Sequence, residues 1–124
     1  MDKKKILIAD DEPNIRLLVS GMLSQDYIVI GASDGEEAIA IARKQNPGLI
    51  LMDIMMPKMD GYAACSVLKA DPATKAIPVV MLTGVGHELN KKLAKEVGAD
   101  GYITKPFSME ELLEVVTPLL TKPK

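Results

Sequence analysis

Five short hydrophobic runs divide the chain at intervals of about 20 to 30 residues. The runs are Ile6–Ala9, Ile28–Ile30, Leu49–Met52, Val79–Leu82 and the shorter Tyr102–Ile103. Hydrophobic runs without polar alternation are typical of strands that are buried on both faces. The pattern therefore predicts five strands in the interior of a parallel sheet.

Segments with the period of an amphipathic helix separate these runs. Between the first two runs, hydrophobic residues fall on one helical face at Ile15, Leu18, Val19, Met22 and Leu23. Asp34 with Glu37, and Ser108 with Glu111, have the spacing of capping boxes. These pairs predict the starts of the second and fifth helices.

Residues that end helices also occur at the expected places. Residues 46–48, Asn-Pro-Gly, should end the second helix, and a third is predicted over Gly61–Ala70. Gly98 follows a fourth helix, whose hydrophobic face is formed by Leu89, Leu93 and Val97. Pro118 should end or kink the fifth helix early, and residues 121–124 should form a frayed tail.

The strand and helix patterns alternate five times along the chain. This order predicts an α/β fold, in which helices cover both faces of a parallel sheet through right-handed connections. The length of 124 residues suits one domain. We therefore predict a single domain over residues 1–124, with a core from about residue 4 to about residue 120.

Charge and cysteine content exclude several classes of protein. Lys and Arg total 15 and Asp and Glu total 17, so the net charge of −2 gives no reason to expect direct binding to nucleic acid or to a membrane surface. The single cysteine, Cys65, excludes an internal disulfide and suits a reducing compartment.

No hydrophobic run approaches the roughly 20 residues of a membrane span or the length of a secretory signal. We predict a cytoplasmic protein.

Polar residues directly follow four of the five predicted strands. Asp10 and Asp11 follow the first strand, and Asp53, Thr83 and Lys105 follow the third, fourth and fifth. Taken singly, each residue would more often be a helix cap, a turn residue or a surface lysine. The carboxyl ends of parallel strands share one edge, however, and open α/β sheets bind ligands there. The joint placement therefore favours a common site.

Three carboxylates at one edge need compensating positive charge. Two carboxylates about 4 Å apart repel each other by roughly 4 kcal/mol at an effective dielectric constant of ~20. Lys105 supplies one positive charge, and a hard divalent cation would supply the rest. A pocket of carboxylates and water suits Mg²⁺, whereas Zn²⁺ is disfavoured because no Cys or His lies nearby in the sequence.

Four segments resemble the receiver domains of two-component response regulators, the CheY-like superfamily. They are Asp10-Asp11, Leu51–Gly61, Leu82-Thr83 and Gly98–Phe107, in the order and spacing of that family. The resemblance covers nearly the whole chain. It implies a flavodoxin-like (βα)5 fold with a five-stranded parallel sheet of order 2-1-3-4-5.

The resemblance also implies a role for each matching residue. Asp53 would accept a phosphoryl group, and Thr83 and Lys105 would bind its oxygen atoms. The Mg²⁺ ligands would be Asp10, directly or through water, Asp11, Asp53 and the backbone carbonyl of Met55. The peptide bond between Lys105 and Pro106 is expected to be cis, as it often is in this family.

The same resemblance implies a switch and a set of partners. Thr83 and Tyr102 would move together on phosphorylation, and Tyr102 should be partly exposed in the unphosphorylated form. The phosphodonor would be a histidine kinase or a histidine phosphotransfer protein. The surface of the fourth helix, fifth strand and fifth helix would then bind a downstream protein or a fused output domain. Basic residues on the fourth helix and acidic residues on the fifth suggest a homodimer through that surface as a second interpretation.

Three other functions agree less well with these residues than this hypothesis does. Phosphatases of the haloacid dehalogenase type carry a second Asp two positions after the nucleophile, where this chain has Met55. A flavodoxin-like FMN carrier is disfavoured because the acidic run 10–12 would repel the phosphate of FMN. The remaining alternative is a pseudo-receiver that docks to partners without being phosphorylated. The complete set of three aspartates, a threonine and a lysine argues against it. The main hypothesis is thus a signalling domain and not an enzyme with a separate substrate.

Overall fold

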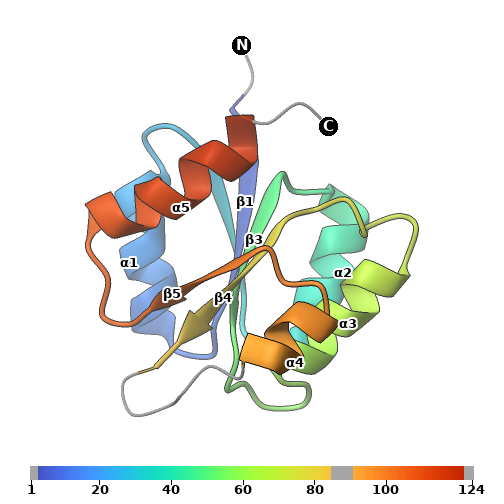
Figure 1. The fold of residues 1–124 in the computed structure, drawn as a ribbon. Helices are drawn as coiled ribbons and strands as arrows, with labels where there is room; N and C mark the ends of the chain where they lie inside the picture. The colour runs from blue at the N-terminus through green and yellow to red at the C-terminus, as the bar shows by residue number, and fades with distance from the viewer. Residues whose placement is uncertain (1–2, 85–90, 122–124) are drawn as a thin grey trace.

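The computed structural model describes residues 3–84 and 91–121, in which five strands alternate with five helices (Figure 1). The strands are β1 (Lys5–Ala9), β2 (Ile28–Ala32), β3 (Leu49–Asp53), β4 (Val79–Thr83) and β5 (Gly101–Thr104). The helices are α1 (Pro13–Leu23), α2 (Gly35–Gln45), α3 (Gly61–Ala70), α4 (Lys91–Glu96) and α5 (Met109–Thr121). Leu89, which was expected on the fourth helix, and residues 122–124 of the expected tail lie outside the described residues.

All strands run parallel in one sheet of order β2-β1-β3-β4-β5. Helices α1 and α5 cover one face of the sheet, and α2, α3 and α4 cover the other (Figure 1). The predicted fold class and strand order are confirmed. The sheet reverses its winding at β1, so β1 and β3 are neighbours at its centre.

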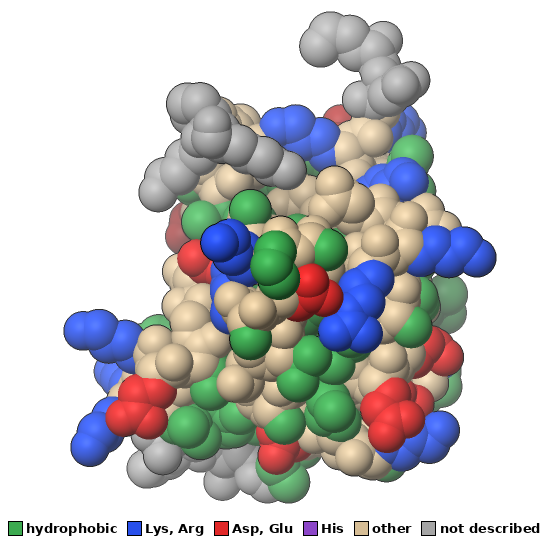
Figure 2. Space-filling view, turned by 90° about the vertical axis from the view of Figure 1, so that its right-hand side faces the viewer, with side chains coloured by type: hydrophobic (Ala, Val, Ile, Leu, Met, Phe, Trp, Pro, Cys, Tyr) green, Lys and Arg blue, Asp and Glu red, His purple; other side chains and the backbone are tan. Residues whose placement is uncertain are grey.

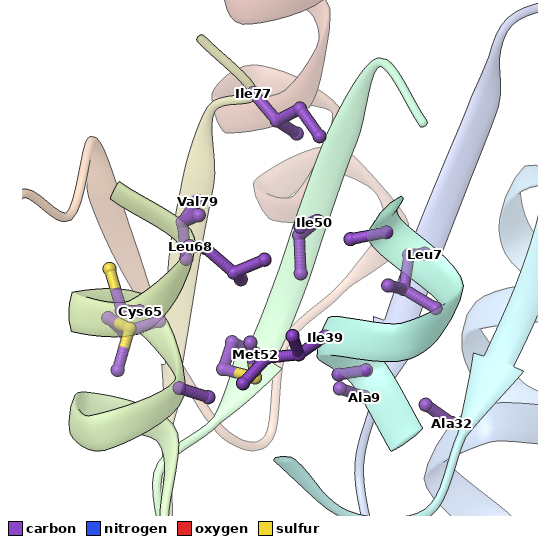
Figure 3. Close-up of a cluster of buried hydrophobic side chains, with 14 of the residues drawn as sticks. Leu7, Ala9, Ala32, Ile39, Ile50, Met52, Cys65, Leu68, Ile77 and Val79 are labelled. Carbon is purple, nitrogen blue, oxygen red and sulfur yellow. The ribbon is translucent and has the colours of Figure 1, made fainter. Parts of the chain in front are cut away.

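Two hydrophobic layers pack against the central strands. Alternate residues such as Leu7, Ile50 and Met52 point toward α2 and α3, as Figure 3 shows. Their neighbours along each strand, such as Ile8 and Leu51, point toward α1 and α5. Because both faces of the sheet are buried, these strands are hydrophobic at nearly every position. Cys65 lies fully buried in the first layer as a free thiol and packs among the hydrophobic side chains.

Helix α3 begins in close contact with the end of β3. The Gly61 amide donates a hydrogen bond to the Ile54 carbonyl at 2.8 Å. A Cβ atom on Gly61 would lie only 2.3 Å from the Asp53 carbonyl oxygen, so no side chain fits there without moving the backbone of Asp53. The side chain of Asp60 caps the helix by accepting a hydrogen bond from the Ala63 amide at 2.8 Å. These contacts fix the backbone on which Asp53 sits.

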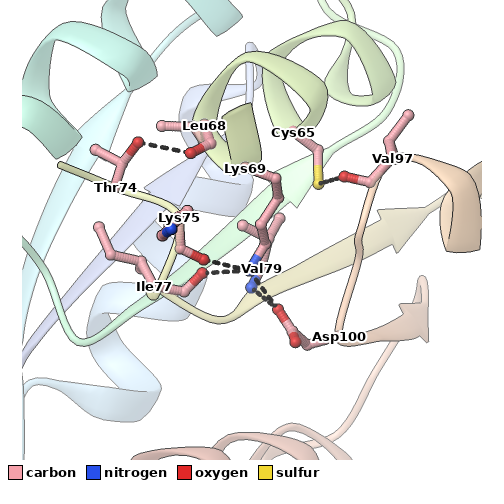
Figure 4. Close-up of polar contacts among 9 residues, drawn as sticks. All are labelled: Cys65, Leu68, Lys69, Thr74, Lys75, Ile77, Val79, Val97 and Asp100. Atoms are coloured by element: carbon pink, nitrogen blue, oxygen red, sulfur yellow. Dashed lines mark hydrogen bonds and ion pairs between the residues drawn. The ribbon is translucent and has the colours of Figure 1, made fainter. Parts of the chain in front are cut away.

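The N-terminal ends of β4 and β5, opposite the edge that carries Asp53, are held by Lys69 of α3 (Figure 4). Its ammonium group donates to the Ile77 carbonyl at 2.8 Å, to the Lys75 carbonyl at 3.3 Å and to the Asp100 carboxylate at 2.9 Å. The same Asp100 oxygen accepts a hydrogen bond from the Val79 amide at 2.8 Å. One cation therefore joins α3 to the starts of β4 and β5.

The expectation that Pro118 ends the fifth helix early is wrong, whereas the kink expected as the alternative stays a prediction. Helix α5 continues to Thr121, with Pro118 inside it. The last turn is held by tertiary contacts that outweigh the lost backbone hydrogen bond. Leu120 is buried against Gly48, its carbonyl accepts a hydrogen bond from the Lys4 ammonium group, and the Thr121 hydroxyl donates to the Thr117 carbonyl at 3.0 Å.

The expected capping boxes occur at α2 and α5 with one difference. At α5, Ser108 and Glu111 exchange both hydrogen bonds as predicted. At α2, the Asp34 carboxylate accepts from the Glu37 amide at 2.8 Å, but the Glu37 carboxylate accepts from the amide of Ser33 instead of that of Asp34. The prediction of both helix starts is confirmed.

On the face of α2, α3 and α4, basic and acidic side chains are interspersed among hydrophobic ones, without a broad patch of one sign (Figure 2). In the described part of the chain, no helix combines the length and the hydrophobicity that crossing a bilayer would require.

Candidate functional site

The central strands bring the predicted site residues to one edge of the sheet. Ala9 at the end of β1 pairs with Met52 of β3. The residues that follow them, Asp10 and Asp53, therefore leave the sheet side by side. Thr83, the last residue of β4, lies on the next strand, and its side chain is buried. Of the predicted site, the structure thus brings Asp10 and Asp53 together and places Thr83 at the end of the adjacent strand.

Lys105 connects the two buried aspartates. Its Nζ atom lies 2.7 Å from Asp10 Oδ2 and 3.3 Å from Asp53 Oδ1. The side chain of Lys105 is 12% exposed, that of Asp10 0% and that of Asp53 7%, so the ion pairs are largely shielded from water. The backbone amide of Lys105 donates to the Thr83 carbonyl at 2.7 Å. The bond between Lys105 and Pro106 is cis, as expected.

Asp10 is fixed through every polar group that it carries. Its amide donates to the Ala32 carbonyl at 3.0 Å, and its carbonyl accepts from Arg16 Nη1 at 2.7 Å. One carboxylate oxygen accepts from the Glu12 amide at 2.9 Å, and the other accepts from Lys105. Asp10 is therefore the most constrained of the acidic residues at this edge.

A cluster of carboxylates extends from Asp10 toward solvent. Carboxylate oxygens of Asp10, Asp11 and Glu12 all lie within 4.8 Å of one another, and only Asp10 is buried. Asp53 is outside this group and approaches it from β3 through Lys105. Glu12 is not among the ligands predicted from the sequence, although its place directly after Asp11 indicates that it could join them.

The donor set at this edge suits a hard divalent cation. The acidic cluster and Asp53 together carry four carboxylates, whereas Lys105 supplies one positive charge. All the side-chain donors are oxygen atoms, which is the ligand type of Mg²⁺, and the exposed carboxylates leave room for water ligands. The residues present therefore fit the expected ion. The Met55 carbonyl stays a predicted ligand, and the side chain of Met55 is exposed.

Tyr102 has the exposure that was expected of it. Its side chain is 47% exposed on β5, and the Lys91 ammonium group lies 5.9 Å from the centre of its ring. Strand β5 pairs with β4, with Thr104 opposite Thr83. The two predicted switch residues therefore lie on neighbouring strands, Thr83 buried at the edge and Tyr102 two residues before Thr104.

Burial and a negative neighbour destabilise the ionised form of the Asp53 carboxylate. The pKa of Asp53 is raised from 3.8 to about 6, first because the carboxylate is buried and then because Asp10 is negatively charged. The charge and hydrogen bond of Lys105 act in the opposite direction without cancelling these effects, and Asp11 raises the pKa slightly further. For Lys105, burial favours the neutral form, but hydrogen bonds and charges of Asp10 and Asp53 outweigh it and raise its pKa. The lysine thus stays charged.

The fold and this arrangement of aspartates, lysine and threonine define a CheY-like signalling domain. The sequence agrees, since residues 6–117 match the response regulator receiver domain. The chain belongs to the response regulator receiver domain family.

Curated relatives of similar sequence are named as transcriptional regulators. The chain is 42% identical to the probable transcriptional regulator ycf27 of Cyanophora paradoxa, over 98% of this chain and 50% of the relative. It is 43% identical to the alkaline phosphatase synthesis transcriptional regulatory protein PhoP of Bacillus subtilis, over 96% of this chain and 49% of the relative. The chain therefore spans about half the length of the curated relatives that it matches.

This chain and solved structures with the same fold cover each other almost completely. A putative response regulator from Chloroflexus aurantiacus has a TM-score of 0.90 at 33% identity, covering 98% of this chain and 100% of its own. Chemotaxis protein CheY4 of Vibrio cholerae gives 0.89 at 36% identity, over 96% and 100%. The receiver domain of a sensor histidine kinase from Pseudomonas aeruginosa gives 0.88 at 28% identity, over 98% and 100%, and is described with a magnesium ion coordinated in its active site cleft.

The raised pKa of Asp53 predicts a pH-dependent effect of its neutral variant. In metal-free buffer, Asp53→Asn should raise the free energy of unfolding by about 1–3 kcal/mol near pH 7.5. The wild-type chain has the full stability of a protonated Asp53 below pH 3.8 and loses it as the pH rises through about 6, whereas the variant has no such group. Urea unfolding in EDTA at several pH values measures the difference. A gain in stability that stays the same down to about pH 4 would contradict the assignment.

Proposed function

We propose that this receiver domain accepts a phosphoryl group on Asp53 from the phosphohistidine of a histidine kinase or phosphotransfer protein, with Mg²⁺ bound at the acidic edge. The observation that carries the proposal is the contact of the buried Asp53 carboxylate with Lys105, beside the cluster of Asp10, Asp11 and Glu12. A carboxylate beside a fixed cation suits covalent chemistry with a phosphoryl group once a divalent cation offsets its negative neighbours.

The chain's own residues position the reacting groups. A carboxylate oxygen of Asp53 attacks phosphorus, an oxygen–phosphorus bond forms, and the phosphorus–nitrogen bond to the donor imidazole breaks. Lys105, 3.3 Å from Asp53 Oδ1, is within reach of an oxygen of the transferred group, and the Thr83 hydroxyl would bind another. Asp10, Asp11, Asp53 and the Met55 carbonyl would hold Mg²⁺, with Glu12 as a further member of the cluster. Bound Mg²⁺ supplies positive charge to the carboxylates and the phosphoryl oxygens.

The output would be a shift between two existing states of the domain. Thr83 moves toward the phosphoryl group, and Tyr102 turns inward from its half-exposed position and leaves Lys91. The surface of α4, β5 and α5 then changes its affinity for a downstream protein, a fused output domain or a second copy of the chain. The transcriptional regulators among the relatives are the basis for an output of that kind, and we place the domain in the cytoplasm.

Phosphorylation itself is tested with a small phosphodonor. With acetyl phosphate and Mg²⁺, intact mass spectrometry should show one added phosphoryl group on the wild-type chain and none on Asp53→Asn. The exposed Asp26 offers a matched control, and Asp26→Asn should behave as wild type. EDTA should prevent the reaction. Failure of the folded wild-type chain to gain a phosphoryl group would support the pseudo-receiver alternative instead.

A hydrophobic groove beside the site is suited to the donor protein. It has a volume of about 440 Å³ and is lined by residues of α1 and α5, namely Asn14, Leu17, Leu18, Gly21, Met22 and Met109. The side chain of Leu17 is 74% exposed. Helix α1 begins two residues after Asp11, and α5 begins shortly after Lys105, so both helices that line the groove start near the site. A donor helix with a hydrophobic face would rest there while its histidine reaches Asp53.

The groove makes a prediction that separates protein donors from small donors. Leu17→Glu should slow phosphotransfer from a kinase that phosphorylates the wild-type chain by about ten-fold or more, because it places a charge in a hydrophobic contact. The rate with acetyl phosphate should not change. Ile28→Glu, on an exposed position at the start of β2, is the matched control and should leave both rates unchanged. Equal slowing with both donors would argue against a docking role for the groove.

A further inference from the structure

Arg16 of α1 contacts both ends of the acidic turn between β1 and α1. Its Nη1 atom donates a hydrogen bond to the Asp10 carbonyl at 2.7 Å, and its backbone amide donates to the Glu12 carbonyl at 3.3 Å. The turn between these contacts carries all three carboxylates of the cluster. Arg16 is the residue that links the conformation of this turn to the first helix.

The side chain of Arg16 reaches the turn by passing over Gly31 of β2. A Cβ atom on Gly31 would lie 3.3 Å from Arg16 Cδ and 3.7 Å from Arg16 Nε. The backbone of Gly31 does not have the positive φ that favours glycine. Glycine in the interior of a strand weakens the strand and often marks a close approach by another group. At Gly31 that group is the arginine side chain.

The acidic turn needs such a restraint because its carboxylates repel one another. Their oxygens lie within 4.8 Å, and Asp11 and Glu12 are exposed, so without a restraint the turn would open toward solvent. Lys105 holds the carboxylate of Asp10 but makes no such contact with the other two. The hydrogen bonds of Arg16 hold the backbone of the turn instead.

We propose that Arg16 is a positioning residue that preorganises the acidic turn for a divalent cation, and that Gly31 provides the space for its side chain. The inference rests on the proposed function, since it concerns Mg²⁺ at that site. Outer partners of metal ligands act in this way, by fixing the orientation in which the ligands meet the ion.

Two effects of removing Arg16 oppose each other. Loss of its positive charge would favour cation binding, whereas loss of the hydrogen bond from its side chain to the Asp10 carbonyl would let the carboxylates separate. The guanidinium group is only half-buried, so water and salt screen its charge. The geometric effect acts on the ligands directly and should dominate.

Calorimetric titration with Mg²⁺ tests this order of effects. Arg16→Gln should raise the Kd for Mg²⁺ about ten-fold and Arg16→Lys about three-fold, near the lower end of the range for outer partners of metal ligands. Arg43→Gln, which removes an exposed ion pair with Asp71, is the matched control and should not change the Kd. Unchanged or tighter binding by Arg16→Gln would overturn the proposal.

A variant outside the site makes the test independent of the arginine itself. Gly31→Val should displace the Arg16 side chain and raise the Kd for Mg²⁺ as Arg16→Gln does. Valine is well tolerated in strands, so the fold should be kept. The double variant should bind Mg²⁺ no more weakly than either single variant, because both changes break the same contact. Additive effects would contradict the shared mechanism.

A metal-free measurement completes the test. The Glu12 amide donates to Asp10 Oδ1 at 2.9 Å, and its hydrogen exchange should accelerate in Arg16→Gln and Gly31→Val but not in Arg43→Gln. If the wild-type chain binds Mg²⁺ and the Arg16 and Gly31 variants bind equally well, this inference fails alone. If the wild-type chain neither binds Mg²⁺ nor accepts a phosphoryl group, the proposed function fails with it.

Discussion

The Lys105 ammonium group lies between two buried carboxylates, and a single positive charge does not balance them. It pairs with Asp10 at 2.7 Å and with Asp53 at 3.3 Å, yet the pKa of Asp53 stays raised to about 6. With Asp11 and Glu12 close by, this edge of the sheet has an excess of negative charge that the chain itself does not neutralise. This excess of negative charge suits a divalent cation, and a phosphoryl group would need that cation to offset the carboxylates.

The sheet order connects this chemistry to a distant surface. Because β4 lies between β3 and β5, Leu82 of β4 pairs with Asp53 on one side, and the next residue, Thr83, pairs with Thr104 on the other. The backbone amide of Lys105 donates to the Thr83 carbonyl, so the two residues that we propose to bind phosphoryl oxygens are joined by a hydrogen bond. Strand β5 also carries Tyr102 under Lys91 of α4. Under the proposed function, a change at Asp53 would reach the outer face of the domain through these two adjacent strands.

Hydrophobic runs predicted the strands well because burial on both faces of the sheet leaves a clear pattern in the sequence. Asp10, Asp53 and Thr83 could then be placed at one edge of the sheet because each lies at the end of a strand. The strand order came from the family resemblance and not from periodicity. The continuation of α5 past Pro118 could not be predicted, since it depends on tertiary contacts. The role of Arg16 was equally hidden, because the path of a long side chain over Gly31 depends on how α1 packs on β2.

The claim that the carboxyl edge of the sheet is a cation site is tested most directly by titrating the unphosphorylated chain with Mg²⁺ and following backbone amide resonances by NMR. The account predicts saturation at one ion per chain, with the largest shifts at residues 10–12, 53–55 and 105, and none of comparable size at the exposed Glu36 or Glu110. Asp11→Asn should weaken the response at all of these positions together. Shifts that are spread over exposed carboxylates without saturation would contradict it.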